Sequence, residues 1–161
     1  MEDILFFFGI EGEKGYLSNW YPAKLKLVFQ NKEYEFENVE QAMMAGKAML
    51  FNDIESFNKI LNKPNPKTVK ALGRKVKNFD PELWDKYKKI IVKMAVKSKF
   101  TYNKDLQDKL ISTGDKYLAE DSPWDKVWGI GTKSLKLKES KKWPGENLLG
   151  IILMEIRNEM K

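Results

Sequence analysis

The segment NVEQAMMAGKAMLF, residues 38–51, carries a helix signal around which the rest of the chain can be arranged. Asn38 is a favourable N-cap, and Gln41 three residues later completes a capping-box pattern. Apolar residues recur at helical spacing and predict one buried stripe, made of Val39, Ala42, Met43, Gly46, Met49 and Leu50. Because a glycine inside a helix costs about 1 kcal/mol relative to alanine, we expect another backbone or a ligand to approach Gly46 closely.

The same helix carries two ionisable side chains on another face. Glu40 and Lys47 are seven residues apart, which is about two turns and roughly 10 Å along the helix. They are too far apart for a direct ion pair, but both can reach into one pocket laid across the helix. In the alternative reading, Glu40 only favours the positive helix N-terminus and Lys47 is solvent-exposed. Spacing alone favours this alternative.

Composition narrows the chemistry that the chain can perform. The 161 residues, 42% of them hydrophobic, suit one domain, residues 1–161. The chain has no cysteine and no histidine, which excludes disulfides, thiolate nucleophiles and Ser-His or Cys-His arrangements. We therefore expect carboxylates, lysine, tyrosine, hydroxyls or backbone groups to carry any catalysis, with no metal and no cofactor.

Neither of the two strongest apolar runs predicts a membrane or export segment. MEDILFFFGI at the N-terminus begins with acidic residues, which is the wrong charge order for a secretory signal. The run Leu148–Met154 is too short to span a bilayer. We expect a soluble cytoplasmic protein.

The net charge of +6 comes almost entirely from lysine, since Arg74 and Arg157 are the two arginines of the sequence. Proteins dedicated to reading nucleic acids usually use arginine and interleave aromatic residues with their basic patch. Plain basic DNA binding is therefore disfavoured, although an anionic substrate is permitted. We expect Arg74 near the middle of a helix, where it either clamps a phosphate or makes the more common surface ion pair.

The order of elements predicts a mainly helical α+β fold with a few short strands near the N-terminus. Strands are expected at residues 4–8, 25–29 and 34–36, and the last two form a hairpin around Gln30, Asn31 and Lys32. Helices are expected at residues 38–51, 53–61, 66–76, 103–112 and 148–160, and in a long segment after Asp80-Pro81-Glu82. Residues 115–121 are expected to form a short extended segment, and residues 133–142 a lysine-rich loop.

The long helix after Asp80 has two expected faces. Its buried side holds Leu83, Trp84, Tyr87, Ile90 or Ile91, Met94 and Ala95. Its other side holds Lys86, Lys88, Lys89, Lys93 and Lys97. Such a lysine run is more often a solvated face than a binding face.

The segment SPWDKVWGIG, residues 122–131, is the second concentration of chemically informative residues. Asp125 lies beside Trp124 and three residues before Trp128, and Gly129 and Gly131 follow. Two tryptophans, an acid and two glycines suit a loop in which a planar ring stacks while the backbone comes close to it. Two core tryptophans and a turn carboxylate explain the composition equally well.

Six segments in this order resemble the NADAR (YbiA-like) family. They are GYLSNWYPA at 15–23, VEQAMMAGKAMLF at 39–51, LGRKV at 72–76, KF at 99–100, SPWDKVWGIG at 122–131 and GENLLGIILMEIR at 145–157. The resemblance covers nearly the whole chain. It implies a single, mainly helical YbiA-like domain with N-glycosidase activity.

The resemblance also implies a set of site residues. Those implied in catalysis are Glu40, Lys47 and Asp125. Those implied in substrate binding are Asn19, Trp20, Gln41, Arg74, Trp124, Trp128, Gly129 and Asn147. Trp20 and Trp128 correspond to ring-facing aromatic residues of the family pattern.

Members that the chain resembles cleave the bond between ribose and a base-like amine. One described activity hydrolyses early riboflavin-pathway intermediates, the ribosylaminopyrimidine phosphates, and a chain of this length resembles that group most. Another removes ADP-ribose from guanine bases of nucleic acid. A third reading is a non-catalytic module that binds ADP-ribose or nucleotides through the same tryptophans and Arg74.

The residue inventory fits N-glycosidic chemistry. Cleavage builds positive charge on the sugar, so a nearby carboxylate is useful, and the departing amine needs a proton. In this hypothesis, Glu40 or Asp125 stabilises the oxocarbenium-like sugar or activates water. Lys47 polarises the ribose or attacks its open-chain aldehyde as an imine, which requires a lowered lysine pKa. The tryptophans stack on the base.

Overall fold

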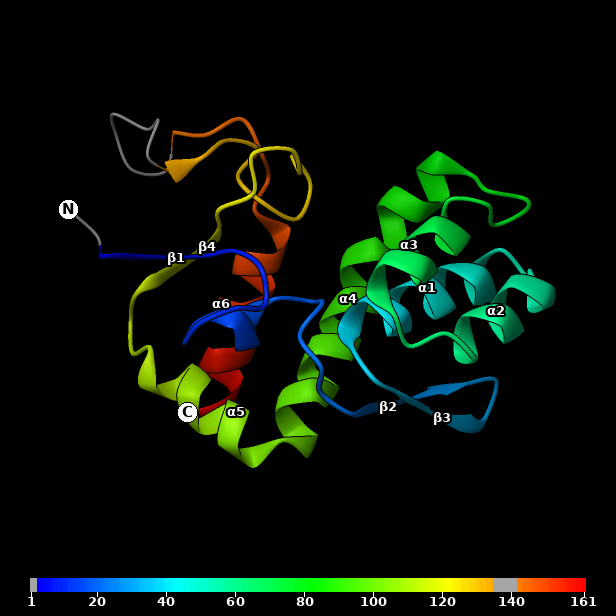
Figure 1. Cartoon of the computed structure of the whole chain (residues 1–161), viewed down its shortest axis with the longest axis horizontal. Coiled ribbons are helices and arrows are strands. Elements are labelled where there is room, and N and C mark those ends of the chain that lie inside the picture. Colours follow the sequence, from blue (N-terminus) through cyan, green and yellow to red (C-terminus); the bar gives the residue numbers. More distant parts are fainter. Residues whose placement is uncertain (1–2, 135–141) are drawn as a thin grey trace. The chain divides into compact units, whose positions relative to one another are not determined.

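The computed structural model describes residues 3–134 and 142–161. Two structural units make up the chain: residues 22–104 form one, and residues 1–21 together with 105–161 form the other. Figure 1 labels their helices and strands. The lysine-rich loop expected at 133–142 lies largely outside the described residues.

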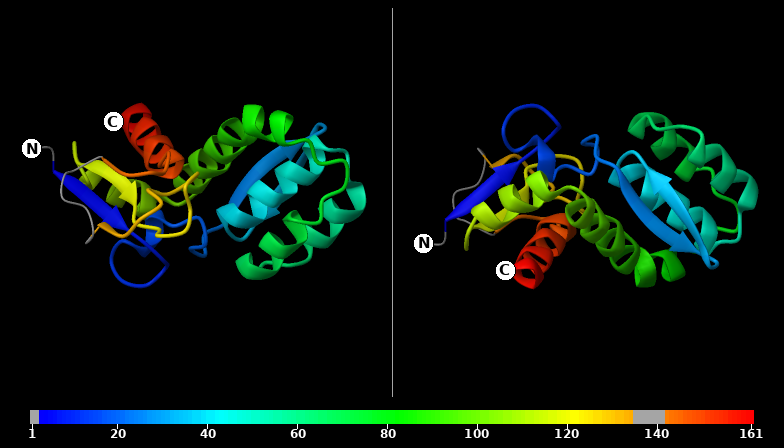
Figure 2. Two further views of the ribbon diagram at one scale, coloured as in Figure 1. Left: turned by 90° about the horizontal axis from the view of Figure 1, so that it is seen from above. Right: turned by 90° about the horizontal axis from the view of Figure 1, so that it is seen from below.

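The unit of residues 22–104 is organised around helix α1, Val39–Leu50. Its other elements are β2 (Leu25–Phe29), β3 (Lys32–Phe36), α2 (Ile54–Leu61), α3 (Pro66–Gly73) and α4 (Pro81–Tyr102). All five contact α1, and Figure 1 shows α1 with the other three helices around it. β2 and β3 form the predicted antiparallel hairpin, seen side by side in the right panel of Figure 2. Gln30 and Asn31 make its turn with φ of 50° and 65°.

Helix α1 is buried on almost every side. Every residue from Val39 to Gly46 is buried, and so is Ala48, which goes beyond the single stripe that the periodicity predicts. The predicted cap is confirmed, because the Asn38 side chain accepts a hydrogen bond from the Gln41 N–H at 2.8 Å. The Gln41 side chain accepts from the Glu37 N–H at 2.8 Å, one residue earlier than in a standard capping box.

Close packing at two glycines joins α1 to its neighbours. A Cβ atom added to Gly46 would lie 2.6 Å from the Ile91 side chain of α4. The neighbour of Gly46 is therefore a side chain, and the expectation of a backbone or ligand there is wrong. A Cβ on Gly73 would lie 1.9 Å from the sulfur of Met44, so α3 approaches α1 closely where its helix ends.

The end of α3 differs from the prediction. The helix ends at Gly73 and Arg74 is its C-cap, so the expectation that Arg74 lies mid-helix is wrong. The Lys75 N–H bonds to the Leu72 carbonyl at 3.0 Å, which tightens the last turn. Val76 is still buried, but it lies in the connection to α4.

The expected faces of α4 are partly wrong. Asp80 caps the helix as predicted, with its side chain accepting from the Glu82 and Leu83 N–H groups. However, Met94 of the expected buried side is 46% exposed, and Lys88 of the expected solvated side is buried. Of the two isoleucines, Ile91 packs against Gly46 of α1 and Ile90 is 54% exposed. The helix packs against both α1 and β2, so its buried surface differs from the single apolar stripe expected from spacing. The buried apolar residues in its second half are Val92, Ala95, Val96 and Phe100.

The other unit combines two strands and two longer helices. β1 (Ile4–Phe7) pairs in parallel with β4 (Tyr117–Glu120), with Ile4 opposite Tyr117. α6 (Leu148–Met160) packs on β4, and α5 (Lys104–Ser112) leads into this unit. A short helical turn, η1, spans Gly15–Leu17. The prediction of a mainly helical α+β fold is confirmed.

In the described part of the chain, no helix is both long and apolar enough to cross a membrane.

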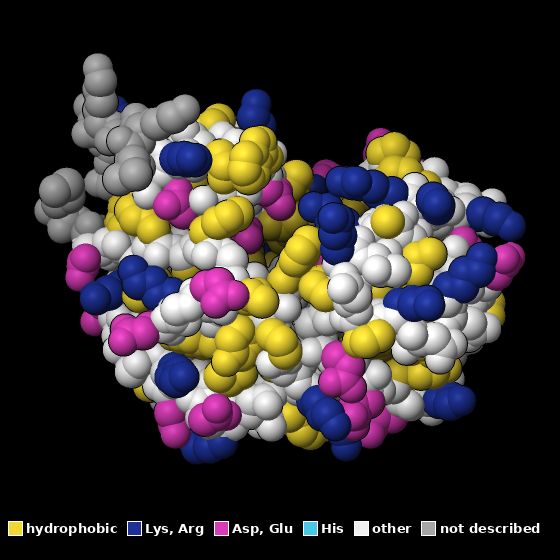
Figure 3. All heavy atoms as spheres, in the orientation of Figure 1, with side chains coloured by type: hydrophobic (Ala, Val, Ile, Leu, Met, Phe, Trp, Pro, Cys, Tyr) yellow, Lys and Arg dark blue, Asp and Glu magenta, His cyan; other side chains and the backbone are white. Residues whose placement is uncertain are grey.

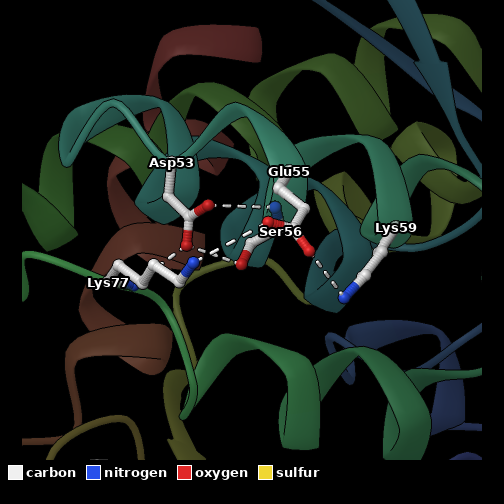
Figure 4. Close-up of polar contacts among 5 residues, drawn as sticks. All are labelled: Asp53, Glu55, Ser56, Lys59 and Lys77. Atoms are coloured by element: carbon white, nitrogen blue, oxygen red, sulfur yellow. Dashed lines mark hydrogen bonds and ion pairs between the residues drawn. The ribbon is translucent and has the colours of Figure 1, made fainter.

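A carboxylate network fixes the start of α2 (Figure 4). The Asp53 side chain accepts hydrogen bonds from the Ser56 N–H at 3.1 Å, the Ser56 hydroxyl at 2.6 Å and the Lys77 N–H at 2.9 Å. Glu55 forms ion pairs with Lys59 and Lys77 at 3.2 and 3.7 Å. The hydrogen bond from Lys77 is the largest cause that holds the Asp53 pKa below its ordinary value, and the Ser56 hydroxyl is the next.

Replacing Asp53 should destabilise the protein in a pH-dependent way. Asp53→Ala removes a helix cap and a partner of the Lys77 N–H, and should lower the free energy of unfolding at pH 7 by about 2 kcal/mol. Because the folded pKa is depressed, this stabilisation is complete above the unfolded pKa of about 4 and is lost as the pH falls through the lower folded value. Urea denaturation at pH 7 and pH 3 should show the difference from wild type narrowing in acid. Glu55→Ala, which removes only exposed ion pairs, is the control. An equal difference at both pH values would contradict this role.

Candidate functional site

Two aromatic rings lie at the end of the Lys47 side chain, and two charged side chains act on it electrostatically. We call these residues the Lys47 cluster: Glu40, Lys47, Arg74, Phe79 and Trp84. The Lys47 ammonium lies over the Phe79 ring, 4.6 Å from its centroid, and over the Trp84 ring at 5.5 Å. Phe79 belongs to the connection between α3 and α4, and Trp84 to the first turn of α4. All five residues lie in the unit of residues 22–104.

The electrostatic environment of Lys47 disfavours its charged form. Burial lowers the pKa of Lys47 most, the positive charge of Arg74 lowers it further, and the negative charge of Glu40 partly opposes both. In the described part of the chain, the Lys47 ammonium makes no ion pair and no hydrogen bond. A lysine that is half-buried, without a bonded counter-charge and with a lowered pKa is a recognised mark of a functional site.

Lys47 is half-buried and not solvent-exposed as in the alternative reading, whereas Glu40 does lie where that reading places it, at the start of α1. The Glu40 side chain is only 4% exposed, and it lies in the first turn of α1, at the positive end of the helix dipole. Its effect on the Lys47 pKa shows that the two residues interact electrostatically. The charges of Glu40 and Arg74 both act on the pKa of Lys47, and the shared pocket stays a prediction.

The other two predicted binding residues of this unit differ in their surroundings. Gln41 is 2% exposed, and its amide donates to the Ile60 carbonyl at 3.0 Å while its oxygen accepts from Glu37. Its side chain therefore ties α1 to the end of α2. Arg74 is exposed, and its guanidinium makes no ion pair with a described residue, so it can accept an anionic group.

Charge substitutions should move the Lys47 pKa in opposite directions. Arg74→Gln removes a like charge and should raise the pKa, whereas Glu40→Gln removes the opposing charge and should lower it. Titration of the ¹³Cε resonance of Lys47 in protein labelled with ¹³C-lysine measures both shifts, with the resonance assigned from Lys47→Arg. Lys75→Gln, next to Arg74 in sequence, should have the smaller effect. A Lys47 pKa unchanged in Arg74→Gln would contradict the charge coupling.

The segment 122–131 in the other unit forms a turn held by its own carboxylate. The Asp125 side chain accepts hydrogen bonds from the Val127 N–H at 3.0 Å and the Trp128 N–H at 2.9 Å. Of the two expected readings, the turn carboxylate describes this geometry. The tryptophans are not core residues, because Trp124 is 81% exposed and Trp128 is half-buried. Both retain ring surface that a planar ligand can contact.

Asn147 connects this turn to the strand and helix beside it. It is 1% exposed and has a left-handed backbone with φ of 53°. Its side-chain oxygen accepts from the Glu120 N–H at 3.0 Å, and its amide donates to the Leu118 carbonyl at 3.0 Å. Its own N–H bonds to the Gly129 carbonyl at 3.0 Å. The observed contacts of Asn147 are thus with backbone of β4 and the turn.

Gly129 and the segment before residue 22 complete the predicted set. A Cβ on Gly129 would lie 2.9 Å from the Ser122 Cβ and 3.0 Å from the Glu120 carbonyl oxygen, so this glycine permits the turn to pack on β4. Asn19 is buried and Trp20 is 36% exposed. The binding roles of all these residues stay predictions.

Two members of the Lys47 cluster were not predicted as site residues. Trp84 was expected only on the buried face of α4, and Phe79 had no predicted role. The available signal was their position around the Asp80 cap, because Phe79 and Trp84 occupy the N′ and N4 positions, whose apolar side chains often pack together at a helix start. No group of three or more acidic side chains with the spacing of a metal site occurs within residues 3–134 and 142–161.

A family model, the NADAR domain, matches residues 6–161. The chain belongs to the NADAR domain family.

Named relatives and a solved structure agree with this membership. The chain is 44% identical over 146 residues to N-glycosidase R617 of Acanthamoeba polyphaga mimivirus, covering 88% of this chain and 85% of that protein. It is 26% identical over 164 residues to riboflavin biosynthesis protein VVA0006 of Vibrio vulnificus, covering 100% of this chain and 40% of that protein. The NMR structure of E. coli YbiA has the same fold, with a TM-score of 0.80 and 23% identity over 99% of this chain and 85% of that one. At the level of class, the prediction of a hydrolase acting on N-glycosidic bonds is confirmed.

Proposed function

We propose that this protein is an N-glycosidase that hydrolyses the ribose–base bond of a phosphorylated ribosyl substrate, with ribosylaminopyrimidine phosphates of riboflavin biosynthesis as the substrate class. The names of the relatives support the reaction, and the riboflavin-related relative supports the substrate class. The observation that carries the proposal is the Lys47 cluster, where an amine with a lowered pKa has no bonded counter-charge and is electrostatically coupled to a buried carboxylate. The predicted cytoplasmic location suits such a metabolite.

We assign to Glu40 the stabilisation of the positive charge that develops on the substrate in the transition state. Cleavage through a lysine imine places positive charge on C1 of the sugar and the nitrogen bonded to it, and a buried carboxylate interacts with that charge more strongly than an exposed one because less water screens it. Alternatively, Glu40 accepts a proton from the attacking water. Asp125 is the alternative carboxylate, and its side chain accepts two hydrogen bonds within the turn.

Lys47 acts on C1 of the sugar in its neutral form. Its amine adds to C1 of the open-chain ribosylamine, the base nitrogen takes up a proton and leaves with its bonding electrons, and an imine remains on Lys47. Water then adds to the imine, which releases the sugar phosphate and restores the free amine. Arg74 is exposed beside this amine and is suited to the substrate phosphate, because a guanidinium binds phosphate oxygens in pairs.

The proposed role of the tryptophans in binding the base rests on the family resemblance. Trp124 and Trp128 have accessible ring surface, and Trp20 has some as well. Flat rings stack on flat bases with little dependence on the pattern of ring substituents. The proposed binding roles of Asn19, Gly129 and Asn147 rest on the family resemblance.

Removing the Glu40 charge should abolish most of the turnover. Glu40→Gln keeps the size of the side chain and should lower kcat by about two or more orders of magnitude if the carboxylate acts in the transition state. The assay is mass-spectrometric detection of base released from ribosylaminopyrimidine phosphate. Glu37→Gln, an exposed acid just before the same helix, is the matched control and should remain active. A folded Glu40→Gln protein with full turnover would return Glu40 to a purely structural role.

A second candidate substrate is ADP-ribosylated guanine in nucleic acid. The observation in its favour is that every charged side chain from Ser56 to Phe79 is a lysine or arginine. Lys59 and Lys77 pair with Glu55, while Lys67, Arg74 and Lys75 are exposed cations of α3 and the turn after it. In Figure 3, Lys and Arg side chains gather over this part of the unit. Such a surface suits a phosphate backbone.

Salt dependence separates the two substrates. If the α3 cations bind a phosphate backbone, kcat/KM on an oligonucleotide carrying ADP-ribosylated guanine should fall by about tenfold or more between 50 and 200 mM salt. Lys67→Glu should weaken that reaction, whereas Lys104→Glu, at the start of α5, is the control. Base release from free nucleotides alone, insensitive to salt, would remove this candidate. Binding of nucleotides without any base release would instead indicate the non-catalytic module.

A further inference from the structure

The Lys47 ammonium is held by ring faces instead of by acceptor atoms. Its nitrogen lies over Phe79 at 4.6 Å and over Trp84 at 5.5 Å from the ring centroids. Both distances are within the range of a cation–π contact. We infer that Phe79 and Trp84 are positioning residues for Lys47, whose ring faces keep the amine in one place without taking a proton from it. This inference rests on the proposed role of Lys47.

We call the two rings, Phe79 and Trp84, the aromatic clamp. They lie on either side of the start of α4. Asp80 caps α4, its side chain accepting from the N–H groups of Glu82 and Leu83, and its carbonyl accepts the Trp84 N–H at 3.0 Å. The cap therefore fixes Phe79, just before it, relative to Trp84, one turn after it. Phe79 is also braced by Phe51, whose ring centroid lies 5.3 Å away in an edge-to-face arrangement.

Phe51, the ring that packs against Phe79, belongs to the end of the helix that carries Lys47. Phe51 is the C-cap of α1 and follows Lys47 by one helical turn, so its ring and the lysine chain project from neighbouring positions. The Phe51 N–H bonds to the Lys47 carbonyl at 3.2 Å. The same turn of backbone therefore places both Lys47 and Phe51, the ring that packs against Phe79.

Ring faces have a chemical advantage over a carboxylate at this position. A carboxylate within ion-pair distance favours the ammonium form and occupies an N–H of the amine. An aromatic face attracts the cation more weakly and accepts no strong hydrogen bond, so the amine can lose its proton without breaking one. The charged groups that act on Lys47 are Glu40 of α1 and Arg74 at the end of α3. Together with burial, they leave its pKa below the ordinary value.

Neither the lysine nor the two rings are enclosed in the core. Phe79 is 45% exposed, and Trp84 and Lys47 are half-buried. We expect a sugar to approach the amine over Phe79. An aromatic residue in a buried packing role would show much less exposure.

Leucine and tyrosine substitutions at Phe79 separate positioning from packing. Phe79→Leu keeps apolar bulk but removes the ring face, so the Lys47 pKa in the free protein should fall by about half a unit. In the same variant kcat should fall about tenfold or more, with KM changed less than about twofold, because the amine is misplaced in the transition state. Phe79→Tyr, which keeps the ring, should restore most of the turnover and the pKa.

The matched control is another cation–π contact in the same unit. Lys26 lies over Tyr102 at 5.5 Å, and Tyr102→Leu should leave kcat and the Lys47 pKa unchanged. Trp84→Leu and Trp84→Phe repeat the comparison at the second ring in case Phe79→Leu does not fold. Folded leucine variants with an unchanged Lys47 pKa and unchanged kcat would overturn the inference. The pKa is measured without substrate, so inactive wild-type protein would refute the proposed function while the pKa result still decides whether the rings act on Lys47.

Discussion

Burial of α1 on almost every side is the constraint on which the unit of residues 22–104 depends. A helix surrounded by a hairpin and three helices needs small or apolar residues nearly throughout, and it needs its end groups satisfied by neighbouring side chains. Asn38 and Gln41 meet the second need, and Gly46 allows Ile91 of α4 to come close. Burying a charged side chain on such a helix costs free energy, so a charged residue kept there points to a functional role.

The ionisable residues of α1 take their chemical character from that burial. Glu40 is nearly inaccessible, and Lys47 is half-buried. Arg74 comes close because α3 ends where Gly73 meets Met44, and the α4 cap brings Phe79 and Trp84 to the same place. Burial and the positive charge of Arg74 therefore disfavour the charged form of the Lys47 amine. This combination is one of the established ways in which proteins make a lysine nucleophilic.

Local signals in the sequence predicted the elements better than their environments. Caps such as Asn38, Asp53 and Asp80 act through neighbouring backbone, so the helix starts were correct to within a residue. The faces of α4 were partly misjudged because Met94 has the spacing of a core residue and Lys88 that of a solvated one, but the neighbours that determine burial come from distant sequence. Within the site, Glu40 and Lys47 could be predicted as a pair because both lie on one helix. The aromatic clamp depends on how the α3–α4 connection folds back to α1, which periodicity does not encode.

Trapping of a lysine imine tests the central claim most directly, because the protein contains a second lysine with an altered proton affinity. Lys99 of α4 is 1% exposed, and burial lowers its pKa to about 7. Reaction with ribosylaminopyrimidine phosphate in the presence of borohydride, followed by peptide mass spectrometry, locates any reduced adduct. The account predicts an adduct on the peptide containing Lys47, absent in Lys47→Arg and weakened in Phe79→Leu. An adduct at Lys99, or full turnover in Lys47→Arg with no adduct in the wild-type protein, would contradict it.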